Sequence, residues 1–268
     1  MPGACNFNYA RTIIIPSQMT CKFSHRPRQN DMRSAHQLLK SLLPSRATAN
    51  PAGAGLPQTT REVFASVYRK NLWGRSLFRK FYSGPGSHDA DLVEPYIKAV
   101  RTFLATLPAP ADVVDLGCGD FNVGRRLRDA CHRYVACDVV PELVAHNGRR
   151  FAALDVDFKC VDITNDPLPE GDIVFLRQVL QHLDNAQILQ VLSKLNHYRF
   201  LVLTEHLPDA EEFTPNADQH NGSGIRLNVK SGVVLTAPPF NLQPRSEQTI
   251  CCVKKYGGTI RTTVYGLR

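Results

Sequence analysis

The sequence predicts an α/β protein with a Rossmann-like, doubly wound sheet that is mostly parallel, carries helices on both faces and ends in a C-terminal antiparallel hairpin strand. Short apolar runs alternate with amphipathic stretches of helical length through the body of the chain, which is typical of a parallel sheet covered on both faces. The first run ends in Asp115 and is followed by Gly117 and Gly119, and the second run ends in Asp138. The last two runs are joined by Tyr256-Gly257-Gly258, which indicates a hairpin.

The expected elements follow one another in strict alternation. Two helices precede the sheet, at 61–83 and 89–107, and Pro108 and Pro110 end the second one. Strands are expected at 112–116, 134–138, 157–161, 172–176 and 200–204, helices at 123–131, 141–151 and 185–195, a short turn at 165–171, and the hairpin at 249–254 and 259–267.

The net charge of +8 belongs mostly to the first 61 residues, which hold eight Lys or Arg and one acid. The remainder is nearly neutral, so it gives no electrostatic reason to expect nucleic acid as a partner. No apolar run approaches the roughly 18 residues that span a membrane, so no membrane partner is expected. Eight cysteines contain no C-x-x-C pair, and no metal site is expected.

Residues 1–60 are expected to be a poorly ordered basic extension, and residues 61–268 to be the functional domain, with 61–108 as an N-terminal helical lid. The extension is compatible with a flexible tail, an organelle-targeting leader, or an upstream start for which Met32 is the true initiator. Cytoplasmic localisation is expected, with organelle targeting as the alternative.

The glycine turn differs from a dinucleotide-binding fingerprint. That fingerprint needs a third glycine at position 122, where this chain has Asn122. Asp115 would also repel a pyrophosphate and attract a positively charged ligand. Asp138, at the tip of the second strand, is placed to accept hydrogen bonds from two ribose hydroxyls; the alternative is an acid that only caps the following helix.

This pattern resembles motif I of the class I S-adenosylmethionine-dependent methyltransferases, D-x-G-x-G-x-G. Phe121 stands where the third glycine would be, so the turn around the methionine part of the cofactor is expected to differ. The resemblance implies S-adenosylmethionine as cofactor and Asp138 as the ribose ligand. It also implies that Asp162 binds the adenine amino group while Ile163 packs on the ring; the alternative is that Asp162 only forms a turn. Arg177 would lie where methyl donor and acceptor meet, and it completes the predicted cofactor site, which consists of Asp115, Gly117, Gly119, Asp138, Asp162, Ile163 and Arg177.

The segment after the fourth strand resembles the D-x-V-x-x-x-x-V-L-x-H-L region of small-molecule methyltransferases. His182 is a candidate general base or substrate contact, and the alternative is a structural histidine. Glu205 and His206, at the tip of the fifth strand, are the other two catalytic candidates, and nothing in the sequence chooses among the three. The turn containing Ser87 is expected to be either a lid over the cofactor or an ordinary connection, and residues 207–244 to form part of the acceptor pocket.

The predicted function is transfer of a methyl group to a small-molecule acceptor by in-line displacement. A nicotinamide-dependent oxidoreductase would use the same half-fold, but Asn122 and Asp115 argue against it. A catalytically silent methyltransferase-like assembly factor is the non-enzyme alternative. The acceptor and the oligomeric state cannot be read from the sequence.

Overall fold

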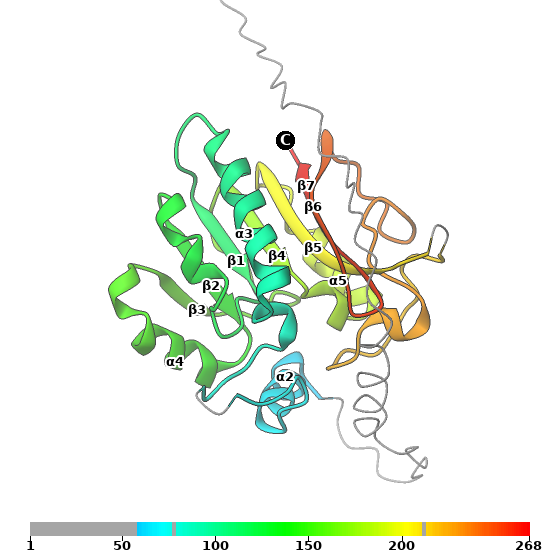
Figure 1. Cartoon of the computed structure of the whole chain (residues 1–268), viewed down its shortest axis with the longest axis horizontal. Coiled ribbons are helices and arrows are strands. Elements are labelled where there is room, and N and C mark those ends of the chain that lie inside the picture. Colours follow the sequence, from blue (N-terminus) through cyan, green and yellow to red (C-terminus); the bar gives the residue numbers. More distant parts are fainter. Residues whose placement is uncertain (1–57, 77–78, 211–212) are drawn as a thin grey trace, which may run out of the picture. The chain divides into compact units, whose positions relative to one another are not determined.

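A computed structural model describes residues 58–76, 79–210 and 213–268, and most of the expected N-terminal extension lies outside these residues. Seven strands form one sheet in the order β3-β2-β1-β4-β5-β7-β6 (Figure 1). Strands β1 to β5 are parallel, and the β6–β7 hairpin joins β5 in antiparallel fashion through β7, which confirms the predicted fold class. The strands are β1 (Val113–Leu116), β2 (Tyr134–Asp138), β3 (Asp157–Cys160), β4 (Ile173–Arg177), β5 (Phe200–Pro208), β6 (Ser246–Lys255) and β7 (Gly258–Gly266).

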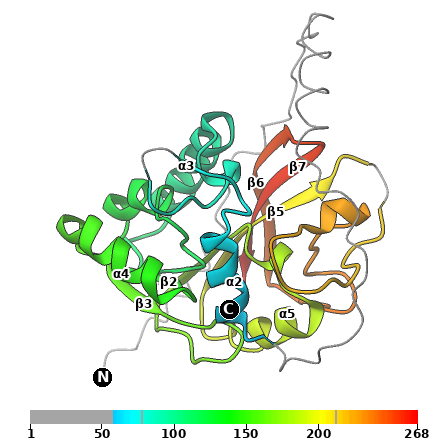
Figure 2. The same cartoon turned by 90° about the horizontal axis from the view of Figure 1, so that it is seen from below.

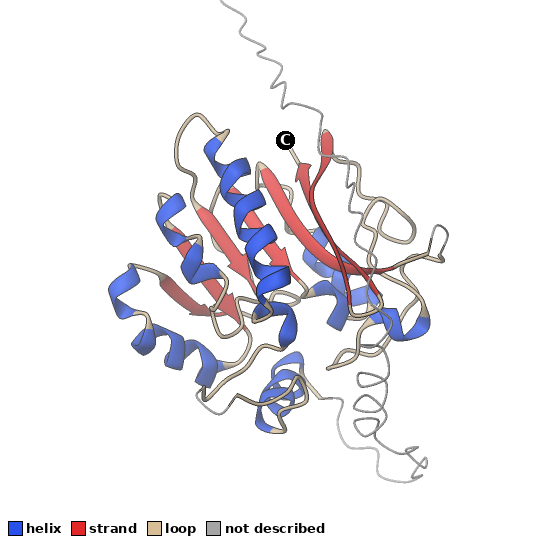
Figure 3. Cartoon of the chain, viewed as in Figure 1, coloured by secondary structure: helices blue, strands red, loops and turns tan. Residues whose placement is uncertain are grey.

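Helices cover both faces of the sheet (Figure 3). Helix α3 (Ala90–Ala105) packs on one face, and α4 (Pro141–Arg150) and α5 (Asn185–Leu192) pack on the other. Successive strand residues point to opposite faces. Val113 therefore joins the α3 layer and Val114 the α4–α5 layer, and both are fully buried. This is why the strands read as continuous apolar runs.

Helix α2 (Thr60–Arg69) lies across the carboxyl ends of the parallel strands (Figures 1 and 2). It starts at a capping box in which Thr59 and Glu62 satisfy each other's backbone amides. The predicted continuation to residue 83 is wrong, because Asn71 and Gly74 adopt positive φ angles of 53° and 107° and end the helical path.

The predicted helix at 123–131 is also wrong. Two short 3₁₀ turns, Gly124–Arg126 and Arg128–Ala130, replace it. A nine-residue helix containing a glycine is marginal by itself. A tertiary contact competes with its backbone ladder: the guanidinium of Arg101 donates to the Arg126 carbonyl at 2.9 Å.

Strand β5 runs four residues beyond its predicted end. Its parallel neighbour β4 stops in register with Thr204, but β7 continues to pair with β5 as far as Pro208. Glu205 and His206 are consequently strand residues whose side chains point to opposite faces of the sheet. No helix in the described parts of the chain is long and apolar enough to cross a membrane.

Candidate active site

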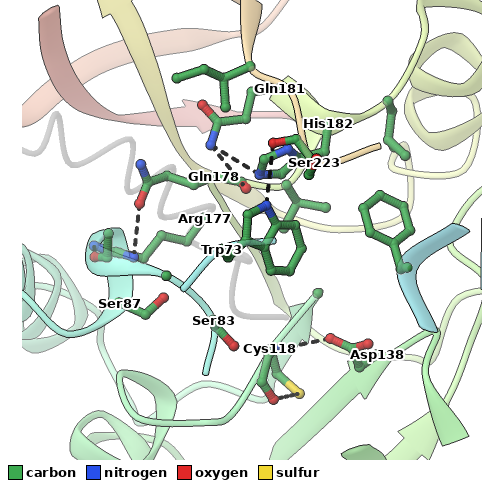
Figure 4. A pocket seen from close by; sticks show the side chains of 18 of the residues that line it. Trp73, Ser83, Ser87, Cys118, Asp138, Arg177, Gln178, Gln181, His182 and Ser223 are labelled. Atoms are coloured by element: carbon green, nitrogen blue, oxygen red, sulfur yellow. Dashed lines mark hydrogen bonds between the residues drawn. The ribbon is translucent and has the colours of Figure 1, made fainter. Parts of the chain in front are cut away.

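A cavity of about 300 Å³ lies at the carboxyl ends of β1, β2, β4 and β5, beside α2. The order of strands reverses here, between β1 and β4, which is where open α/β sheets bind ligands. Figure 4 shows Asp138 at one end of this cavity and Gln181 and His182 at the other, with Trp73 between them. Eight of the predicted site residues line it: Gly117, Gly119, Asp138, Asp162, Ile163, Arg177, His182 and His206.

The turn after β1 brings the backbone to the cavity wall. Gly117 and Gly119 have φ angles of +78° and +56°, which residues other than glycine rarely adopt. A Cβ on Gly117 would lie 2.5 Å from the Val179 side chain, and one on Gly119 would lie 2.4 Å from Oγ of Ser83. Conformation and close packing therefore both require glycine at these positions.

Phe121, at the position of the missing third glycine, retains the left-handed backbone with φ at 58°. Its side chain is fully buried. The ring packs edge-to-face against Tyr134 and Phe158, with centroids 5.5 and 4.9 Å away. The turn thus keeps a conformation that glycine would adopt easily, and burial of an aromatic ring offsets the backbone strain.

Asp138 is held rigidly at the end of β2. Its Oδ1 accepts the amide of Val140 and its Oδ2 accepts the amide of Gly119, both at 3.1 Å. Burial raises the pKa of Asp138 to about 6, although these backbone hydrogen bonds lower it. A carboxylate is therefore fixed at the cavity wall with its orientation set by the backbone.

The Asp162 carboxylate stabilises its own turn by hydrogen bonds and also lines the cavity. Its Oδ1 accepts the amide and the hydroxyl of Thr164 at 3.0 and 2.6 Å, and its Oδ2 accepts Nδ2 of Asn165 at 3.0 Å. Burial raises its pKa, but these hydrogen bonds together bring the pKa below its usual value. The turn-forming role is present, and Ile163 lines the cavity beside it.

Arg177 lies at the end of β4 and reaches the segment 83–88 that borders the cavity. Its Nη2 donates to the Gly86 carbonyl at 2.7 Å and its Nη1 to Oε1 of Gln178 at 3.3 Å. The guanidinium stacks 4.8 Å above the Tyr96 ring. Gln178 has a φ of 56°, a strained conformation that is concentrated at functional sites.

Asp115 lies behind the main cavity and does not line it. It borders a small second cavity of about 30 Å³ together with Arg177. The Tyr134 hydroxyl donates to its Oδ2 at 2.9 Å. Burial raises the pKa of Asp115 to about 7, although Tyr134 and Arg177 lower it.

The segment 83–88 is fastened over the glycine turn. Oγ of Ser83 accepts the Asp120 amide at 2.7 Å, and Nε2 of His88 lies 2.6 Å from Oδ2 of Asp120. The carbonyl of Ser87 accepts Nδ2 of Asn122 at 2.8 Å. Residues Ser83 to Ser87 line the cavity, so the segment forms one of its walls.

His182 holds a loop against the cavity. Its Nδ1 lies 3.0 Å from the Gly224 carbonyl, which can only accept, so Nδ1 carries the proton. The His182 carbonyl accepts the Gly222 amide at 3.0 Å, and the ring lies 5.0 Å from Trp73. Burial lowers its pKa to about 4. These contacts suit a structural histidine, one of the two roles that the sequence left open, and His182 also lines the cavity.

Residues 113–198 match the family model described as a methyltransferase domain. This part of the chain is therefore similar to the class I methyltransferases that the glycine turn resembles. S-adenosylmethionine is the cofactor of that class. The described residues of the methyltransferase hold no group of three or more His, Cys, Asp or Glu side chains that could bind a metal ion.

Solved structures share the fold of the methyltransferase. Magnesium protoporphyrin IX methyltransferase from Synechocystis PCC 6803 is 15% identical with a TM-score of 0.50, over 80% of this chain and 100% of that one. Human N-acetylserotonin methyltransferase is 18% identical with a TM-score of 0.50, over 78% of this chain and 60% of that one. No curated protein sequence matches significantly.

Glu205, unlike its neighbour His206, does not line the cavity. It shares the strand face of Leu201 and Leu203. Its two carboxyl oxygens are buried, with the backbone amides of Leu180 and Gln181 nearby. Burial raises its pKa to about 8, although the charge of Arg226 and these two backbone amides lower it. The extension of β5 explains why these two catalytic candidates, adjacent in the sequence, do not both line the cavity.

Replacement of Glu205 by glutamine is expected to stabilise the enzyme by about 1–3 kcal/mol at pH 8. With a pKa raised from 4.5 to about 8, folding takes up a proton between these values, so stability falls as the pH rises through this window. The gain should therefore grow from pH 5 to pH 8 in urea denaturation. Methyl transfer should change by less than about twofold, because Glu205 lies outside the cavity; a large loss of turnover would return Glu205 to the catalytic machinery.

Sequence reasoning missed the aromatic wall contributed by α2 and the turn after it. Phe64, Tyr68 and Trp73 all line the cavity. Tyr68 and Trp73 pack edge-to-face at 5.3 Å, and the Tyr68 hydroxyl lies 2.9 Å from Oγ of Ser83. The available signal was their apolar periodicity, which equally predicts an ordinary core face.

Proposed function

We propose that this enzyme transfers the methyl group of S-adenosylmethionine to a small-molecule acceptor bound in the same cavity. The observation that supports this is the continuity of the cavity from Asp138 to His206 and Tyr256. Its walls include α2 and the segment 83–88, so an acceptor has to fit inside, next to the cofactor.

In this proposal Asp138 binds the ribose. A carboxylate oxygen can accept two hydrogen bonds, and each oxygen of Asp138 accepts one from a backbone amide. One accepting position therefore remains on each oxygen, which suits two adjacent hydroxyls. Asp162 has fewer accepting positions left. Its Oδ1 already accepts two hydrogen bonds from Thr164 and its Oδ2 accepts one from Asn165, so one position remains on Oδ2 for the adenine amino group.

The methionine part would lie between the glycine turn and Arg177. Two hydrogen bonds of Arg177 hold Gly86 and Gln178, and its other N–H groups and its charge suit the methionine carboxylate. Asp115 would act from behind this wall. Its carboxyl group accepts a hydrogen bond from the Tyr134 hydroxyl at 2.9 Å, and its negative charge favours the charged form of Arg177.

The cofactor supplies a methyl group on a positively charged sulfur, which is already electrophilic. What the chain contributes is alignment of acceptor, methyl group and sulfur, together with exclusion of water. The fastening of the segment 83–88 by Asp120 and Arg177 provides the rigid wall that alignment requires.

The family match favours a methyltransferase over the nicotinamide-dependent oxidoreductase. Two measurements distinguish an active methyltransferase from a catalytically silent methyltransferase-like protein. Calorimetry with S-adenosylhomocysteine and with NADH measures cofactor choice, and transfer of label from methyl-labelled S-adenosylmethionine to a small-molecule library measures activity. Binding of S-adenosylhomocysteine without any transfer would favour the silent protein, and tighter binding of NADH would overturn the proposal.

Binding of S-adenosylhomocysteine is expected to weaken at acidic pH. The pKa of Asp138 is about 6, and only the ionised carboxylate can accept from both ribose hydroxyls while it keeps its two backbone amides. Below pH 6 binding must expel a proton, so Kd should rise about tenfold between pH 8 and pH 5. Calorimetry across this range measures the effect, with circular dichroism to show that the fold persists; a flat profile would contradict the assignment.

A further inference from the structure

At the end of the cavity remote from Asp138, two aromatic side chains that could donate hydrogen bonds are already engaged. Nε1 of Trp73 donates to the Ser223 carbonyl at 3.4 Å, and the Tyr256 hydroxyl donates to Oδ2 of Asp89 at 2.5 Å. Both side chains still line the cavity. What they offer a ligand is therefore ring surface, which suits a flat apolar molecule.

His206 offers the opposite hydrogen-bonding property, a free acceptor. Its Nε2 lies 3.2 Å from the Lys255 carbonyl and carries the proton, because a carbonyl can only accept. The same ring edge faces the hairpin: a Cβ on Gly258 would lie 2.8 Å from Nε2 and 2.9 Å from Cδ2. Nδ1 is thus unprotonated, on the other side of the ring, and bonded to no residue that the structure describes. Burial lowers the pKa of His206, which keeps the ring neutral.

Formal charge is confined to the cofactor end. Among the described residues that line the cavity, only Asp138, Asp162 and Arg177 carry one. The Gln178 amide packs against Gly86 at the same end, and Nε2 of Gln181 donates to the Gln178 carbonyl at 3.4 Å. An acceptor with an ammonium or carboxylate group would lose its hydration next to His206 without meeting an opposite charge.

We infer that the methyl acceptor is a neutral, flat, apolar compound carrying a hydroxyl group that donates to Nδ1 of His206. This inference rests on the proposed function. In the reaction Nδ1 takes the hydroxyl proton while the oxygen forms a bond to the methyl carbon, and the carbon–sulfur bond breaks with its electron pair passing to sulfur. A methyl ether, a thioether and an imidazolium result, so the positive charge of the sulfonium reappears on His206.

The test uses four ligands with one ring system, titrated by calorimetry into the full-length enzyme saturated with S-adenosylhomocysteine at pH 7.5. They are 2-naphthol, its methyl ether, the anion 2-naphthoate and the cation of 2-(aminomethyl)naphthalene. The naphthol should bind at least tenfold more tightly than each of the others. The ether leaves the buried Nδ1 without a partner, and the two ions lose hydration.

The variant His206→Ala should reduce the preference for naphthol over its ether to less than threefold, while Kd for S-adenosylhomocysteine stays within twofold. The same substitution at the exposed His132 is the matched control and should preserve the preference. If His206→Ala does not fold, His206→Asn keeps a hydrogen-bond acceptor on a smaller side chain and should retain part of the preference.

The outcomes separate the inference from the proposed function. Equal binding of naphthol and ether, tighter binding of either ion, or no naphthol binding up to its solubility limit would overturn the inference while S-adenosylhomocysteine still binds. Failure to bind S-adenosylhomocysteine would instead remove the proposed function.

Discussion

Replacing Phe121 by alanine is expected to lower the free energy of unfolding by about 3–5 kcal/mol. The ring is fully buried and contacts Tyr134, Phe151 and Phe158. Alanine would remove this aromatic cluster and leave a void, while the residue keeps its left-handed φ of 58°. Urea denaturation measures the loss.

Replacing Phe121 by glycine should be less damaging than replacing it by alanine, by about 1 kcal/mol, because glycine adopts the left-handed conformation without strain. Phe175, almost fully buried in β4, is the matched control. There the backbone is an ordinary strand, so glycine should be the worse substitution. The same order at both positions would show that the backbone at Phe121 contributes nothing to the difference.

The sheet and much of the cofactor end could be predicted because their signals are local. Each strand is a short apolar run, and Asp138 and Asp162 directly follow such runs. The rule that parallel strands present their carboxyl ends at one edge then gathers these acids without any knowledge of packing. Gly117 and Gly119 are predictable for the same reason, since the turn needs their conformation.

The acceptor end of the cavity was harder to predict from the sequence, because contacts between residues far apart in the chain determine its structure. The direction of Glu205 depends on how far β7 extends β5, which the apolar run ending at residue 204 does not reveal. The hydrogen-bonding state of His206 depends on the carbonyl of Lys255, 49 residues later. Trp73 has helical spacing in the sequence, but the chain leaves the helix before it, and it becomes part of the cavity wall.

Replacing Asp138 is expected to raise Kd for S-adenosylhomocysteine by about tenfold to a hundredfold, since each charge-assisted hydrogen bond contributes about 1.5–3 kcal/mol. Asp138→Ala would also free the buried amides of Gly119 and Val140, which costs stability. Asp138→Asn is therefore the sharper variant. It keeps one accepting oxygen for the backbone and removes a buried charge.

Asp162→Asn is the matched control within the same cavity. The oxygens of Asp162 already accept three hydrogen bonds from Thr164 and Asn165, so less of this carboxylate is available to a ligand. At pH 8 Asp138→Asn should weaken binding at least tenfold and Asp162→Asn by about threefold or less, as measured by calorimetry. The asparagine at 138 should also abolish the weakening of binding below pH 6, because no proton remains to be expelled there. Equal losses in the two variants, or a pH dependence that survives in Asp138→Asn, would mean that the ribose hydroxyls are held by a group other than Asp138.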